Sequence, residues 1–84
     1  MYEQIRQFVL DDIKENGKNK HDIAKALGFS YTYLSYVLGG HREPSKSMLE
    51  CLANYYDMAI VYYKGQYWIV SGEQKGEQNA DSSN

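Results

Sequence analysis

Hydroxyl-bearing side chains are concentrated in one short segment of the chain, YTYLSY. They are Tyr31, Thr32, Tyr33, Ser35 and Tyr36. A hydroxyl group can donate and accept a hydrogen bond, and the ring or methyl atoms beside it can make apolar contacts. The five side chains lie on or near the start of the second helix of a predicted helix pair. No spacing of Ser, His and Asp in the chain places a nucleophile beside a base and a group that orients that base.

Basic side chains lie on both sides of this segment, at Lys18, Lys20, His41, Arg42 and Lys46. The whole chain of 84 residues has a net charge of −2. Residues 17–46, however, contain five Lys or Arg and two Asp or Glu side chains, a local net charge of +3. This positive charge lies where the phosphates of a bound nucleic acid would be.

Two short helices, joined at Gly28, are expected to position these side chains. The first runs from Lys20 to about Leu27 and the second from Tyr31 to about Leu38, with apolar residues spaced to share a small core. Ser30 can cap the second helix, because its hydroxyl can accept a free N–H of the first turn. Asn19 and Asp22 have the spacing of a capping box, with Asp in place of the usual Glu.

Two further helices are predicted around this pair, over residues 2–15 and 46–56. The later one carries two apolar stripes. Leu49, Leu52, Ala53 and Tyr56 have the spacing of core residues. The second stripe consists of Met48, Cys51 and Tyr55. It predicts either a contact between subunits or packing under the C-terminal segment of the same chain.

Residues 58–71 predict a β-hairpin, because two runs of β-branched and aromatic residues flank Lys64, Gly65 and Gln66. A lone hairpin is marginally stable in water, so it must pack on the helices, pair with a second copy, or do both. Tyr62, Tyr67 and Trp68 therefore join Met48, Cys51 and Tyr55 as candidate dimer-interface residues. The alternative is that the hairpin only completes the core of the monomer. Residues 72–84 are polar, lack aromatic side chains and are predicted to be disordered.

The whole pattern resembles the Cro/repressor-type helix-turn-helix family, also described as lambda repressor-like or XRE-type. The resemblance covers roughly residues 4–58. The matching positions are Ile23, Ala24, Leu27, Gly28, Phe29, Ser30, Leu34, Val37, Gly40, Pro44 and Ala53. Many members carry Gln where this chain has Lys20, which can hold a phosphate as a point charge. The resemblance implies a mainly α fold, with a four-helix lambda repressor-like domain over residues 1–57 followed by the hairpin.

This resemblance also implies a function. A small dimeric Cro-like repressor, of phage or mobile-element type, would bind an inverted-repeat operator in double-stranded DNA through the helix starting at Tyr31. In that mechanism the side chains of Tyr31, Thr32, Tyr33, Ser35 and Tyr36 would meet base edges. The basic side chains at Lys18, Lys20, His41, Arg42 and Lys46 would hold the flanking phosphates. Specificity from one monomer should be modest, because that helix offers no Arg, Asn or Gln to make bidentate contacts with bases. The alternative is a protein-interaction adaptor that uses the helix-turn-helix only as a scaffold. An antitoxin combining both roles ranks third, because the C-terminal tail has few apolar anchors.

Length and composition predict one small domain that is too short for a substrate cleft plus a scaffold, so no enzymatic activity is expected. The single cysteine, Cys51, cannot form an internal disulfide. No run of residues is apolar enough to span a membrane or to act as a signal peptide, which predicts a cytoplasmic protein. Neither His21 nor His41 lies in a cluster with ligand spacing, so no metal or other cofactor is expected.

Overall fold

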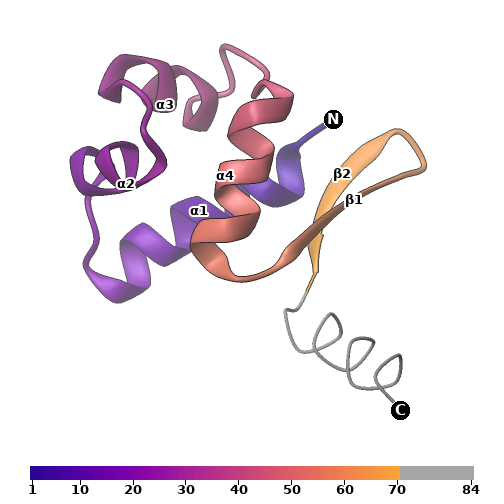
Figure 1. Ribbon diagram of the computed structural model, residues 1–84, viewed down its shortest axis with the longest axis horizontal. Helices are drawn as coiled ribbons and strands as arrows, with labels where there is room; N and C mark the ends of the chain where they lie inside the picture. The colour runs from indigo at the N-terminus through magenta and orange to yellow at the C-terminus, as the bar shows by residue number, and fades with distance from the viewer. Residues whose placement is uncertain (71–84) are drawn as a thin grey trace.

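The computed structural model describes residues 1–70, which form four helices followed by two strands (Figure 1). The helices are α1 (Glu3–Asn16), α2 (Lys20–Leu27), α3 (Tyr31–Leu38) and α4 (Lys46–Tyr56). The strands β1 (Ala59–Tyr63) and β2 (Gln66–Val70) pair antiparallel. The prediction of a mainly helical chain with a C-terminal hairpin is confirmed. The predicted disordered tail, residues 72–84, lies outside the described residues.

Local sequence signals begin and end the helices. The side chains of Asn19, Ser30 and Ser45 cap α2, α3 and α4, each accepting a hydrogen bond from the backbone N–H three residues later. Gly28 ends α2 with a φ of 82°, a conformation that costs glycine little. The predicted capping box differs in one detail. The Asp22 carboxylate accepts from the side-chain amide of Asn19 at 3.1 Å, not from a backbone N–H.

One hydrophobic core joins all four helices and the hairpin. Its most deeply buried side chains are Ile5, Val9, Ile23, Leu34 and Met48. The hairpin contributes Ile69, which is only 7% exposed. The hairpin is therefore part of the monomer core, whatever else it does.

Met48 does not lie on an exposed stripe of α4. Its side chain is 0% exposed, whereas Cys51 is half-buried and Tyr55 is 36% exposed. These three residues share a helical line but differ in burial, because Met48 lies within the core cluster while Cys51 only packs against it. The expectation that Met48 contacts another subunit is wrong for this reason. Met48 is a core residue.

The hairpin turns over two residues, Lys64 and Gly65, which both have positive φ angles (52° and 76°). This geometry is typical of a type I′ turn, which matches the twist of the paired strands. The outer edge of β2 lies against the start of the chain. The N–H of Tyr67 donates to the carbonyl of Met1 at 2.7 Å, and the N–H of Ile69 donates to Oε1 of Gln4 at 2.8 Å.

Among residues 1–70, no helix is long and apolar enough to cross a membrane.

Candidate nucleic-acid interface

Helices α2 and α3 lie together at one end of the molecule, away from the hairpin (Figure 1). Three of the predicted base-reading residues on α3, Tyr31, Thr32 and Tyr36, are exposed. Tyr33 and Ser35 are half-buried. The exposed hydroxyl surface of α3 is therefore smaller than the five-residue set predicted from the sequence.

Tyr33 is bound to the loop between α3 and α4. Its hydroxyl accepts a hydrogen bond from the backbone N–H of Ser45 at 2.8 Å, and its ring packs against Phe29 with centroids 5.5 Å apart. The Arg42 guanidinium carbon lies 5.1 Å from the centre of the Tyr33 ring. This geometry favours a cation–π contact. Tyr33 therefore holds the loop and Arg42 in place beside α3.

Tyr31 carries a partner that sequence reasoning missed. The imidazole of His21, in the first turn of α2, is stacked on the Tyr31 ring with centroids 3.9 Å apart and an interplanar angle of 8°. The two rings form a flat platform where the N-terminal ends of α2 and α3 meet. No spacing rule within one helix could have indicated this stack, because it depends on how the two helices cross.

The predicted phosphate-binding residues separate into two places. His41 and Arg42 lie in the loop after α3, and Tyr36 meets His41 edge to face at 6.4 Å. Lys46 begins α4 and Lys20 begins α2. Lys18 lies apart from these residues, in the link between α1 and α2, and its side chain contacts α1 and α4. Its ammonium group is 2.9 Å from Oδ2 of Asp12 and 5.2 Å from the ring centre of Tyr55.

The Lys18 ion pair belongs to a polar cluster around Asp12, which also accepts hydrogen bonds from the side chains of Asn16 (2.6 Å) and Tyr56 (2.8 Å). Burial alone would raise the pKa of Asp12. The hydrogen bonds from Lys18, Asn16 and Tyr56 outweigh it, so that the pKa lies below its usual value. Burial, together with the bond to Asp12, raises the pKa of Tyr56 far above its ordinary value. The cluster is a structural link between α1 and α4.

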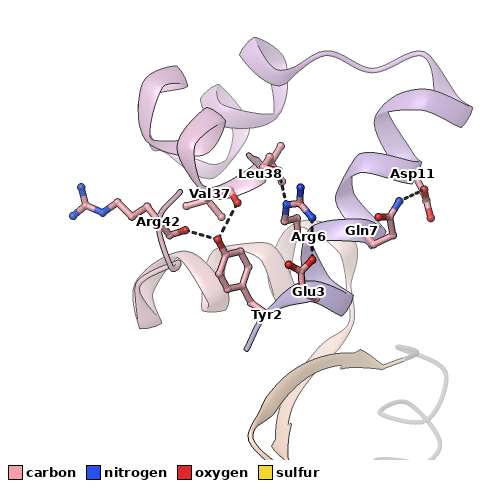
Figure 2. A network of polar contacts seen from close by, with 8 residues as sticks. All are labelled: Tyr2, Glu3, Arg6, Gln7, Asp11, Val37, Leu38 and Arg42. Atoms are coloured by element: carbon pink, nitrogen blue, oxygen red, sulfur yellow. Dashed lines mark hydrogen bonds and ion pairs between the residues drawn. The ribbon is translucent and has the colours of Figure 1, made fainter. Parts of the chain in front are cut away.

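Helix α1 holds the C-terminal end of α3 through two side chains (Figure 2). The Tyr2 hydroxyl donates to the carbonyl of Arg42 at 2.7 Å and to that of Val37 at 3.2 Å. Nε of Arg6 donates to the carbonyl of Leu38 at 2.7 Å, while its Nη1 pairs with Glu3 at 2.9 Å. Burial raises the pKa of Tyr2, which keeps its hydroxyl protonated as a donor. The loop after α3 satisfies the carbonyls of Ser35, Tyr36 and Val37, and Arg6 of α1 satisfies that of Leu38.

The other dimer-interface candidates are distributed over two surfaces. Tyr62 (60%) and Trp68 (38%) are exposed on the hairpin, where Tyr67 is half-buried and stacks edge to face on Tyr62 at 5.0 Å. Tyr55 and the free thiol of Cys51 lie on α4. Nothing in the described part of the chain brings three or more His, Cys, Asp or Glu side chains together as metal ligands.

No protein-family model, curated protein or solved structure matches this chain.

Proposed function

We propose that this chain is a sequence-specific double-stranded DNA-binding regulator with a lambda repressor-like helix-turn-helix domain. The observation that carries the proposal is the capped helix pair α2 and α3, whose exposed hydroxyl groups lie between basic side chains. Helix α3 enters the major groove from its N-terminal end, so that Tyr31, Thr32 and Tyr36 meet base edges and thymine methyl groups. A small chain of this kind acts as a Cro-like repressor by covering a promoter.

Positive charge near α3 supports this docking. Lys20, Arg42 and Lys46 lie at the start of α2, in the loop after α3 and at the start of α4. These positions flank the reading helix, where the sugar–phosphate backbone would run beside the major groove. Arg42 is steadied by the Tyr33 ring. A positioned guanidinium loses less side-chain entropy when it binds a phosphate.

Modest base recognition supports binding as a homodimer. The exposed face of α3 offers only hydroxyl and aromatic groups, none of which makes a bidentate contact with a base. Two monomers related by a two-fold axis would read two half-sites and multiply the selectivity of one. The operator is then an inverted repeat, with half-sites spaced by about one helical turn of DNA.

The test is selection of bound sequences from a random duplex library at near-physiological salt. An enriched inverted repeat is the expected result, and the spacing of its half-sites reports the separation of the two reading helices. Weak retention that falls with salt and enriches no sequence would contradict the proposal. That result would favour the adaptor alternative, in which the exposed tyrosines contact a protein.

A further inference from the structure

The two edges of the hairpin differ. The outward N–H groups of β2, at Tyr67 and Ile69, are bonded to Met1 and Gln4. Residue pairs alternate along an antiparallel ladder, and the pair that closes a two-residue turn exchanges both of its hydrogen bonds. Tyr63 pairs with Gln66 at the turn. The N–H and C=O groups of Ile60 and Tyr62 therefore point away from β2, toward the free edge of β1. No group between residues 1 and 70 bonds to these outward N–H groups.

Strand β1 also lacks the features that protect exposed sheet edges. Its sequence, AIVYY, has no charged residue and no proline, and its pairing with β2 contains no bulge. Val61, Tyr62 and Tyr63 are 43%, 60% and 60% exposed. An apolar strand with a free row of donors and acceptors is a template for pairing with another strand.

We propose that β1 pairs antiparallel with β1 of a second copy, about a two-fold axis at Val61. In this register Ile60 lies opposite the partner's Tyr62, and Tyr62 lies opposite the partner's Ile60. All outward N–H and C=O groups of these residues are then used, in four hydrogen bonds. If the two-fold axis lay at Ile60 or at Tyr62 instead, only one outward-facing residue of each β1 strand would lie opposite an outward-facing residue of the other copy.

Charge complementarity favours a second copy as the occupant. Symmetric antiparallel pairing brings identical strands together, so a charge near the axis would meet its own copy. Strand β1 has none. At both ends of the paired region, the register places Tyr63 opposite the partner's Ala59, with Lys64 directly after Tyr63 and the partner's Asp57 two residues before its Ala59. Each end therefore brings a positive charge close to a negative one.

A groove lies beside the hairpin, between the hairpin and α4. The groove has a volume of about 470 Å³ and is lined by Leu49 and Ala53 of α4 and by Ile60 and Tyr67 of the hairpin. Ile60 and Tyr62 share the sheet face that carries the buried Ile69, yet Tyr62 is exposed. Residues opposite each other on neighbouring strands point to the same face. The partner's Tyr62, beside Ile60, therefore reaches this groove.

This pairing deepens the proposed function, because it supplies the second reading helix that an inverted repeat requires. The hairpin lies at the other end of the molecule from α2 and α3, so pairing leaves α3 free (Figure 1). Its test measures association of the protein without DNA. A failure of dimerisation is therefore distinguishable from a failure to read sequence, which the duplex selection measures.

The first experiment compares the full chain with Tyr62→Pro by sedimentation equilibrium. Proline at position 62 removes an outward N–H and leaves the bonds between β1 and β2 intact. The full chain should be a dimer. In Tyr62→Pro, loss of the two N–H donors should weaken association by about 30-fold or more. Tyr62→Ser is the matched control, because it keeps the N–H and loses only the ring. Its affinity for a second copy should lie between those of the full chain and of Tyr62→Pro. Helical circular dichroism should be the same in all three.

The second experiment tests the register in a Cys51→Ser background. Val61→Cys should form a disulfide-linked dimer under mild oxidation, because residues on the axis form a non-hydrogen-bonded pair with Cα atoms about 4.5 Å apart. Tyr63→Cys alone should not cross-link, but a mixture of Tyr63→Cys and Ala59→Cys should. A full chain that stays monomeric overturns the proposal, as does a dimer that Tyr62→Pro leaves intact or that Val61→Cys does not cross-link.

Discussion

The imidazole of His21 lies flat on the ring of Tyr31, with the two centroids 3.9 Å apart. Tyr31 is the first residue of the helix that we propose to read DNA, and it is exposed. A long side chain at such a position would otherwise sample several rotamers. The stack removes that freedom before binding, which lowers the entropy cost of placing the Tyr31 hydroxyl against a base or phosphate.

Replacing His21 should therefore weaken operator binding. We expect His21→Ala to reduce affinity roughly 2- to 10-fold, the range of a lost aromatic pair. His21→Phe keeps a stacking ring and should retain most of the affinity. Fluorescence anisotropy on the selected operator checks both. Equal losses in the two variants would show that the imidazole acts by a direct contact and not by positioning Tyr31.

The proposed phosphate contacts predict changes in salt dependence. Each of Arg42→Ala and Lys46→Ala should lower the slope of log affinity against log salt by about 0.9 per lost contact. Lys18→Ala should change the slope less, because its ammonium group is engaged by Asp12. Lys14→Ala, on α1, is the control for the loss of one positive charge. Anisotropy titrations at four salt concentrations provide the slopes, and equal slopes in all variants would contradict the docking described above.

The contact between α1 and the end of α3 predicts a loss of stability. Arg6→Ala removes the charged donor that binds the Leu38 carbonyl, and we expect the free energy of unfolding to fall by about 1.5–3 kcal/mol. The matched control is Glu3→Gln. It breaks only the exposed ion pair of Arg6, and should cost about 0.5 kcal/mol or less. Urea unfolding followed by circular dichroism measures the free energy of unfolding of both variants. Similar losses in the two would show that the ion pair with Glu3, and not the bond to the Leu38 carbonyl, provides the stability.

The Asp12 cluster predicts how stability depends on pH. Since the folded pKa of Asp12 lies below the unfolded one, its ionised form contributes stability above the unfolded pKa and loses it as pH falls through the folded pKa. Asp12→Asn should therefore be less stable by about 1 kcal/mol at pH 7, and the difference should shrink as the pH falls through the folded pKa of Asp12. Asp11→Asn, beside it on α1, should show little change at either pH. A pH series of urea unfolding curves tests this.

Local features of the sequence were sufficient to predict the elements. The caps at Asn19, Ser30 and Ser45, and the glycine after α2, act within three or four residues of their own position, so their geometry follows from the sequence alone. The hairpin turn was predicted one residue too long, because Gln66 already belongs to β2. These signals agree with one another along the chain, which is why the four helices and the hairpin were predicted.

Features that depend on packing between elements were not predictable. Met48 has the spacing of a surface stripe, but the angle at which α4 crosses the core decides its burial. The bonds from Tyr2 to Val37 and Arg42 span 35 and 40 residues. The spacing of apolar residues along the chain carries no information about contacts between residues so far apart in the sequence. The stack of His21 on Tyr31 and the engagement of the Tyr33 hydroxyl likewise required the arrangement of neighbouring helices.

The attachment of α3 to Tyr2 and Arg6 has a genetic consequence. The orientation of α3, the helix that we propose to read DNA, is set partly by two residues near the start of the chain. A substitution at either position can tilt α3 without altering any residue that meets the operator. In a screen for restored repression, suppressors of damaging changes in α3 should therefore arise in α1 as well. Substitutions that relax or alter the choice of operator should also be found in α1.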